Sequence, residues 1–122
     1  MTDARKRMGA LAEDAVAERL LAAGWTIRAR NWRCRLGEID IVAVDGDCLV
    51  VVEVRARRAG GRLGTPEESV DHRKARQLMR LGWALVQQAG WEGAWRIDVA
   101  AVTIGARGDV ASIQHYQSAV EA

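Results

Sequence analysis

The sequence predicts an α/β domain in which a mixed β-sheet is flanked by helices, in the order α-β-β-β-α-β-β. Two segments repeat apolar residues at helical spacing, and several shorter segments are rich in β-branched residues. The strongest of these, GEIDIVAVDGDCLVVVEVRAR at residues 37–57, is apolar on both faces, which indicates a sheet covered on both sides. A one-sided α+β sandwich is the alternative. With 122 residues, the chain is expected to form one domain, residues 1–122.

The first helix is predicted over residues 4–23, because apolar residues recur there every three or four positions and Gly24 follows as a stop. Its expected inward residues are Met8, Leu11, Ala12, Ala15, Val16, Leu20 and Ala23. A strand is predicted from Trp25 to Trp32, where apolar and polar residues alternate. Trp25 and Trp83 fit core positions. Trp32 fits either core packing or stacking on an unpaired base.

The second and third strands are joined at Asp45-Gly46, a dipeptide typical of a two-residue hairpin turn. With this turn, Glu38 lies opposite Glu53, and residues that are opposite or two apart share a face. Polar residues are therefore predicted on one face, at the end far from the turn: Glu38, Asp40, Glu53 and Arg55. The other face is predicted to be apolar: Ile39, Ile41, Cys48, Val50, Val52 and Val54.

Residues 56–66 are rich in Gly and Arg and are predicted to form a loop. The second helix has two candidate starts, a capping-box pattern at residues 65–68 and the capping residue Asp71, and it is expected to end near residue 88. Its expected inward residues are Ala75, Leu78, Leu81, Gly82, Leu85, Val86 and Ala89. The last two strands are predicted at residues 95–104 and 111–116.

The composition argues against several classes of protein. The chain is 49% hydrophobic and 28% charged, which is typical of a folded protein rather than a disordered one. No apolar run reaches the roughly 18 residues that span a bilayer, and no signal-type segment precedes the first helix. Cys34 and Cys48 lack the spacing of a zinc finger and are interpreted as reduced thiols. We therefore expect a cytoplasmic protein without a membrane partner.

Asp40 and Glu53 are the main candidates for chemistry. Both are flanked by residues of the buried type, and burying an unpaired charge is too costly to be incidental. Carboxylates, waters and a backbone carbonyl such as that of Val54 suit Mg²⁺ or Mn²⁺. For Glu38, an ion pair with Arg35 or Arg55 at the end of the strand is the alternative.

Glu13 lies on the flank of the apolar stripe of the first helix. On periodicity alone, it is interpreted as a solvated glutamate that interacts with the helix dipole. His72 and His115 stand apart from other potential ligands and are not assigned to a metal.

These residues carry a family resemblance. A glutamate in the first helix is followed by GEID, a hairpin, VEVR, and ESV with RK at residues 68–74. Together these features resemble the YraN-like family of bacterial proteins. That family is similar to archaeal Holliday junction resolvases within the PD-(D/E)xK nuclease superfamily. The resemblance covers about residues 9–85.

The resemblance implies a restriction-endonuclease-like core and a metal-dependent endonuclease site for DNA, including branched DNA. By position, it implies that Asp40, Glu53 and Glu13 are metal-binding and catalytic acids, with Glu38 as an additional site residue. Arg55 stands where the superfamily usually has a lysine. An arginine can hold a phosphate but cannot act as a base. A homodimer is implied by the resolvase resemblance alone.

Basic residues surround the proposed site, although the net charge is only +2. The predicted nucleic-acid contacts are Arg35, Arg57, Arg58, Arg62, Arg73 and Lys74. No segment resembles a helix that reads the major groove, so we expect recognition of the backbone or shape of DNA, with RNA as the alternative. Three hypotheses follow: a metal-dependent nuclease, a nucleic-acid-binding module with little cleavage, and a scaffold in which the acids pair with the arginines.

Overall fold

The computed structural model describes residues 3–60 and 70–120. Its elements are α1 (Asp3–Ala22), β1 (Thr26–Cys34), β2 (Gly37–Asp45), β3 (Cys48–Arg58), α2 (His72–Ala89), β4 (Trp95–Ile104) and β5 (Val110–Val120). This order confirms the predicted α-β-β-β-α-β-β sequence of elements. No helix in the described ranges is long and apolar enough to cross a membrane.

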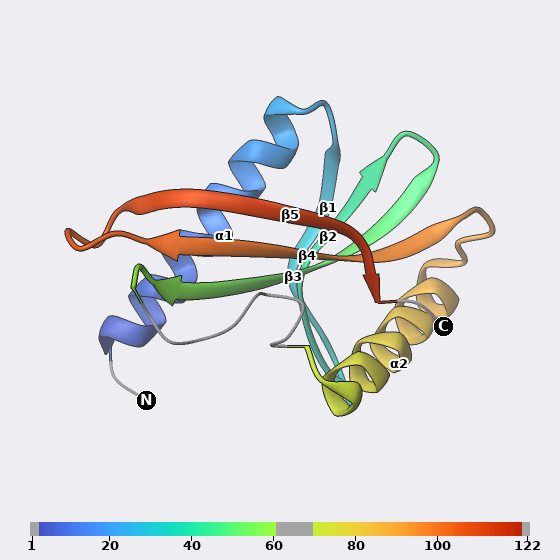
Figure 1. The fold of residues 1–122 in the computed structure, drawn as a ribbon. Coiled ribbons are helices and arrows are strands. Elements are labelled where there is room, and N and C mark those ends of the chain that lie inside the picture. Colours follow the sequence, from blue (N-terminus) through green and yellow to red (C-terminus); the bar gives the residue numbers. More distant parts are fainter. Residues whose placement is uncertain (1–2, 61–69, 121–122) are drawn as a thin grey trace.

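The strands form one mixed sheet in the order β1-β2-β3-β4-β5 (Figure 1). Only β3 and β4 are parallel, and α2 lies between them in the sequence. Parallel neighbours need such a crossover connection, whereas the antiparallel pairs are joined by short turns. The sheet is strongly twisted, so that the β1–β2 pair crosses the other strands steeply in Figure 1.

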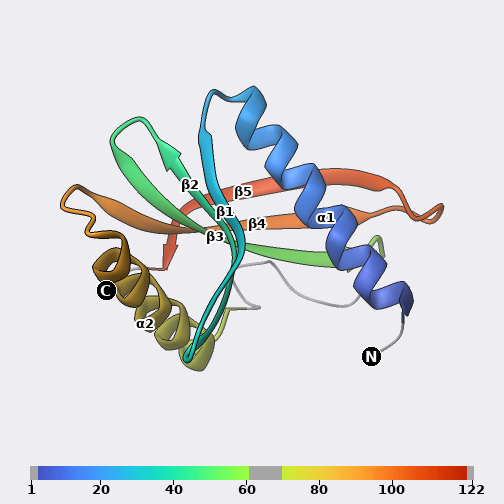
Figure 2. The same cartoon turned by 180° about the vertical axis from the view of Figure 1, so that it is seen from behind.

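The two helices cover opposite faces of the sheet, as Figures 1 and 2 show together. The core between α1 and the sheet includes buried residues of both: Ala12, Val16, Leu20, Ile41, Val50, Val52, Ala100 and Val102. The core between α2 and the sheet likewise includes buried residues of both: Ile39, Val42, Leu49, Val51, Leu78, Leu81, Leu85 and Ile97. The sheet is therefore covered on both sides, as its two-faced apolar strands predict, and the one-sided alternative is wrong.

The buried stripe of each helix differs in part from the predicted one. On α1, Ala17 is buried whereas Leu11 is exposed, which rotates the inward face toward Glu13. On α2, Trp83 is 52% exposed, so its predicted core position is wrong. Gly82 takes the inward place beside it, because the Trp95 ring fills the space that a side chain at Gly82 would need.

The turn of the β2–β3 hairpin lies one residue later than predicted, which shifts the pairing between β2 and β3 by two positions. Asp45 pairs with Cys48, which leaves Gly46 and Asp47 as the turn, and the predicted pairing of Glu38 with Glu53 is wrong. A shift of two positions keeps side chains on their faces, whereas a shift of one would exchange them. The grouping of Asp40 with Glu53 therefore survives the correction.

Asn31 interrupts the regular alternation of β1 and β2. Its φ angle is 53°, and it lies between the pairs Arg30–Ile41 and Trp32–Ile39. Asparagine is among the few residues that tolerate this left-handed conformation. Ile39 consequently packs on the α2 side while Ile41 packs on the α1 side, so the prediction that they share a face is wrong.

Two further boundaries differ from the predicted ones. Residues 56–58 belong to β3 rather than to the loop expected over 56–66, and the rest of that loop's length lies largely outside the described residues. The fifth strand continues to Val120 instead of ending at Tyr116. Of the two candidate starts for α2, Asp71 is the cap, because its side chain accepts the Lys74 backbone N–H at 2.9 Å. The capping-box pattern at residues 65–68 lies outside the described residues.

Candidate functional site

Asp40 and Glu53 meet where β2 and β3 separate. The last residue pair of the two strands is Ile41 with Val52, and beyond it the Asp40 side chain accepts the backbone N–H of Val54 at 2.8 Å. Burial and the neighbouring Glu53 charge raise the pKa of Asp40 to about 7, despite the opposing hydrogen bond from Val54. The fold thus holds two acids together at a cost in electrostatic energy that a cation would relieve.

Glu53 is the more deeply buried acid, with 6% of its surface exposed. Its Oε2 atom lies 3.1 Å from the Lys74 ammonium and 3.8 Å from the Arg55 guanidinium. Lys74 comes from the first turn of α2, whereas Arg55 lies two residues along β3. The charge of Glu53 is therefore compensated from two elements, and the closer cation belongs to the helix.

Glu13 faces Asp40 from α1 and is buried, with 8% of its surface exposed. Arg30 Nε donates to its Oε1 at 3.0 Å, and Asn31 Nδ2 donates to its Oε2 at 3.1 Å. The interpretation of Glu13 as a solvated helix-end residue is therefore wrong. Its negative charge contributes to the raised pKa of Asp40.

Glu38 lies at the edge of this group. Asn31 Nδ2 donates to its Oε1 at 2.8 Å, and Arg33 forms an ion pair with it at 3.3 Å. Neither Arg35 nor Arg55 is its partner in these contacts, although an ion pair at the strand end was the expected alternative. Asn31 therefore connects Glu38 to Glu13 through one amide group.

The donor set can be compared with the needs of a divalent cation. Among residues 3–60 and 70–120, no group of three or more Asp, Glu, His or Cys side chains is arranged so that it could hold a metal ion. Mg²⁺, however, is usually bound through one or two carboxylates, with waters and substrate phosphates completing its shell. Asp40 and Glu53 fit that pattern, and Glu13 faces Asp40 from the other side.

A basic groove lies between the β1–β2 turn and α2. Its volume is about 550 Å³, and it is lined by Arg35, Leu36, Arg73, Arg76, Gln77 and Arg80. Gly37 allows the turn to approach the helix, because a Cβ there would lie only 3.0 Å from Gln77 Nε2. Figures 1 and 2 both place this turn beside the start of α2. The helix thus supplies both the groove arginines and Lys74.

The family model described as "Uncharacterised protein family UPF0102" matches residues 12–102, which is most of the chain. The chain belongs to the UPF0102 family.

Its UPF0102 relatives are similar over nearly their whole length. A UPF0102 protein of Pelotomaculum thermopropionicum is 43% identical over 120 residues, covering 98% of this chain and 99% of the relative. A UPF0102 protein of Streptomyces coelicolor is 48% identical over 109 residues, covering 87% and 83% of the two chains. One of Acidothermus cellulolyticus is 46% identical over 115 residues, covering 92% and 84%. These names give the family and no activity.

The predicted basic contacts do not all gather at the site of this UPF0102 chain. Arg35 and Arg73 line the basic groove, and Lys74 lies against Glu53 instead. Arg57 follows Arg55 on the same face of β3. Arg58 lines a separate hollow of about 300 Å³ with residues of α1 and the β4–β5 turn. Arg62 lies outside the described residues.

Sequence reasoning missed Asn31 and the role of Lys74. Asn31 has no signal beyond the tolerance of asparagine for a positive φ angle. Lys74 was detected only as one basic residue among several, because its contact with Glu53 joins elements that are distant in sequence. Asp98 was also overlooked, although it stands between apolar residues in RIDVAAV just as Asp40 does in EIDIVAV.

Asp98 is fully buried on the α1 side of the sheet and has its own partners. It accepts hydrogen bonds from Arg96 Nε at 3.0 Å and the Ser118 backbone N–H at 2.9 Å, and His115 Nε2 lies 2.7 Å away. Burial alone would raise the pKa of Asp98, but these three contacts together lower it below the ordinary value. This acid is therefore satisfied within the protein.

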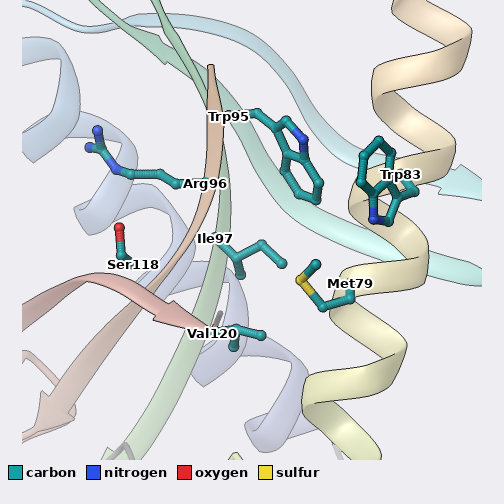
Figure 3. A pocket seen from close by; sticks show the side chains of 7 residues that line it. All are labelled: Met79, Trp83, Trp95, Arg96, Ile97, Ser118 and Val120. Atoms are coloured by element: carbon teal, nitrogen blue, oxygen red, sulfur yellow. The ribbon is translucent and has the colours of Figure 1, made fainter. Parts of the chain in front are cut away.

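An apolar hollow of about 290 Å³ lies between α2 and the strand pair β4–β5 (Figure 3). Trp83 and Trp95 meet there edge to face with ring centroids 5.3 Å apart, and Met79, Ile97 and Val120 complete the apolar wall. In Figure 3, Arg96 points away from this wall, toward the opposite side of the sheet. The residues that line this apolar hollow do not include the acids of the candidate site.

Proposed function

We propose that this UPF0102 chain is a metal-dependent endonuclease-like phosphodiesterase that acts on DNA. The observation that carries the proposal is the pair of acids, Asp40 and Glu53, held together where β2 and β3 separate. The raised pKa of Asp40 supports a site that is incomplete without a cation. The resemblance to resolvase-like nucleases supports the same reading, and structured or branched DNA is the finer part of the proposal.

Asp40 and Glu53 would hold Mg²⁺ or Mn²⁺, with the Val54 carbonyl, waters and a substrate phosphate as further ligands, while Glu13 would add negative charge beside Asp40. Such a cation would supply positive charge that polarises the phosphoryl group and acidifies an attacking water. The protein's own contribution is to keep both carboxylates in place. The Val54 N–H fixes the Asp40 carboxylate, and burial holds Glu53 among the core residues of β3.

The reaction would be hydrolysis of a phosphodiester. A water oxygen forms a new bond to phosphorus, the bond from phosphorus to one sugar oxygen breaks, and one proton of the water ends on that sugar oxygen. The other proton is released to solvent, which leaves a phosphate monoester and an alcohol. Arg55 is 3.8 Å from Glu53 and would hold a phosphate oxygen beside the acids.

The basic groove supports a polyanionic substrate. Its arginines come from the β1–β2 turn and from successive turns of α2, a spacing that suits the repeated phosphates of a backbone rather than a single anion. Apart from Leu36, its lining consists of arginines and a glutamine, so it has no aromatic platform for stacking bases. We therefore favour recognition of a duplex backbone without sequence preference, and DNA rather than RNA by the resolvase resemblance.

A second candidate function is a nucleic-acid-binding module with little or no cleavage. Arg55 favours it, because a lysine usually stands at this position in the superfamily and an arginine cannot replace it as a base. In this case the groove would still bind the backbone.

The test is a cleavage assay with Mn²⁺ on linear and branched duplexes of one sequence. The unmodified protein is compared with Glu53→Ala and with Glu18→Gln, which alters an exposed acid of α1. We expect Mn²⁺-dependent cleavage that Glu53→Ala removes and Glu18→Gln retains, with the branched duplex cut faster.

Cleavage that survives Glu53→Ala would point to a contaminating nuclease and would overturn the assignment of the site. Binding of both duplexes without cleavage by the unmodified protein would favour the second candidate function. If the unmodified protein neither binds nor cleaves either duplex, the scaffold hypothesis remains.

A further inference from the structure

The cation closest to Glu53 comes from α2 rather than from β3. The Lys74 Nζ atom lies 3.1 Å from Glu53 Oε2, and the Arg55 Nη1 atom lies 3.8 Å from the same oxygen. Both cations approach one carboxylate oxygen from different elements. The strand position that usually carries a lysine in resembling nucleases thus carries an arginine, while a lysine reaches the same acid from the helix.

The position of Lys74 is fixed by its helix. The Asp71 side chain caps α2 by accepting the Lys74 backbone N–H at 2.9 Å, and the Asp71 carbonyl accepts the Ala75 N–H at 2.8 Å. Ala75 and Leu78 pack against the sheet in the α2-side core. Lys74 is therefore presented from a capped and packed first turn, which suits a group that must hold a defined position.

The first turn of α2 places Lys74 between the basic groove and the buried acid Glu53. Arg73 and Arg76 line the basic groove, whereas Lys74 lies against Glu53. A phosphate backbone that follows the groove arginines along α2 would meet the Lys74 ammonium before it meets the acids. Lysine suits this place because its ammonium is a compact point charge on a flexible stem, whereas the arginine fork needs a planar partner.

We propose that Lys74 is the catalytic lysine of this chain, in place of the lysine that β3 lacks. Its ammonium contacts the phosphoryl group that is attacked and stabilises the negative charge that develops on the non-bridging oxygens. Arg55 has the lesser role of holding the backbone. The inference rests on the proposed function and assigns one step of it to one residue.

The experiment compares turnover at saturating duplex and Mn²⁺ for Lys74→Ala, Lys74→Gln, Arg55→Ala and the double variant Lys74→Ala/Arg55→Lys. Arg107→Ala, in the distant β4–β5 turn, controls for the loss of one positive charge. Both Lys74 variants should lose about 100-fold or more in turnover, as the loss of one such electrostatic group typically costs. Arg55→Ala should lose less than about tenfold, and the double variant should recover at least about tenfold over Lys74→Ala.

A second measurement follows Mn²⁺ binding without DNA by calorimetry. Lys74→Ala should bind Mn²⁺ as tightly as the unmodified protein or several-fold more tightly, because a positive charge has left the neighbourhood of Glu53. Weaker Mn²⁺ binding would show that Lys74 merely holds Glu53 in position, and the catalytic assignment would be overturned. A double variant without recovered turnover would overturn it as well.

The two proposals fail differently. If the unmodified protein cleaves and both Lys74 variants cleave equally well, only the assignment of Lys74 falls. If the unmodified protein neither binds Mn²⁺ nor cleaves, the proposed function falls and the assignment falls with it.

Discussion

Asp40 Oδ2 accepts the backbone N–H of Val54 at 2.8 Å, so an acid of β2 is anchored on the strand that carries Glu53. The contact takes the place of regular strand pairing, which ends one residue earlier at Ile41 and Val52. It keeps two carboxylates close together despite their mutual repulsion. At the proposed metal site, the Asp40 charge that would bind a cation is therefore the same charge that destabilises the metal-free fold.

Asp40→Asn should stabilise the metal-free protein. The raised pKa means that ionised Asp40 is unfavourable in the folded state. Asparagine keeps an oxygen for the Val54 N–H and offers an N–H toward Glu53, without the charge. At about 1.4 kcal/mol per pH unit of pKa difference, reduced by solvent screening, we expect a gain of roughly 1–3 kcal/mol at pH 8. Urea unfolding in EDTA measures this gain.

The same variant should no longer bind Mn²⁺, which calorimetry tests. Glu18→Gln, an exposed acid on α1, should change neither property. As the pH falls from about 7 toward the unfolded pKa of 3.8, the stability difference between Asp40→Asn and the unmodified protein should shrink, and it should largely vanish near pH 4, where Asp40 is protonated in both states. A destabilised Asp40→Asn protein that still binds Mn²⁺ would show that Asp40 is structural.

The stability of the unmodified protein should fall as the pH rises from about 4 to about 7. A raised carboxyl pKa means that the folded state holds a proton on Asp40 that the unfolded chain releases near its ordinary pKa of 3.8. Mn²⁺ must displace this proton, so its affinity should increase up to about tenfold per pH unit below 7 and level off above it. Calorimetry in two buffers of different ionisation enthalpy would count the released proton. An affinity that is constant between pH 5.5 and 8 would contradict the Asp40 assignment.

Asp98 should behave in the opposite way, because its pKa is lowered in the folded state. Its stabilising contribution is present above the unfolded pKa near 4 and is lost as the pH falls through the lower folded value. Asp98→Asn should cost about 2–4 kcal/mol at pH 7, since it leaves the charge of Arg96 without its buried partner. Urea unfolding between pH 2.5 and 7 measures both effects.

The matched comparison for Asp98→Asn is Arg96→Met/Asp98→Asn, which removes both members of the pair. The double variant should be no less stable than the single one, and both should bind Mn²⁺ normally. Loss of Mn²⁺ binding in Asp98→Asn at full stability would mean that the wrong acid had been assigned to the metal.

The grouping of Asp40 with Glu53 was predictable even though the turn was not. Side chains alternate along a strand, so a register error of two positions moved the turn to Gly46-Asp47 without exchanging faces. The same rule failed at Ile39, because Asn31 adopts a positive φ angle opposite that part of β2. A local pattern cannot report a distortion imposed by the neighbouring strand.

Contacts between elements that are distant in the sequence also could not be predicted from it. The burial argument that singled out Asp40 applies equally to Asp98, and only the fold shows that Arg96 and His115 satisfy the latter. Similarly, Lys74 was one of several basic residues until α2 brought its ammonium to Glu53. The length of β5 depends on such a contact too, because the Ser118 N–H that bonds to Asp98 lies beyond the predicted end of the strand.

Gly82→Ala should destabilise the fold by packing alone. A Cβ at this position would lie 2.3 Å from the Trp95 ring, in the apolar wall of Figure 3, so the ring or the helix must move. Overpacking of this kind typically costs about 1–3 kcal/mol. Urea unfolding of Gly82→Ala and Gly82→Ala/Trp95→Leu separates the causes, because the smaller side chain should relieve the clash. An equal loss in both variants would contradict the role of the ring.

Arg76 and Arg80 should contribute to DNA binding through charge rather than through base recognition. Each arginine that neutralises one phosphate adds about 1 to the salt dependence of binding, so Arg76→Ala and Arg80→Ala should each reduce the magnitude of the slope of log K against log salt by about 1. Fluorescence anisotropy in EDTA, with two duplexes of unrelated sequence, should show the same loss for both. Arg107→Ala should leave the slope unchanged. A loss confined to one duplex would indicate base contacts, and an unchanged slope in both groove variants would place the DNA elsewhere on the protein.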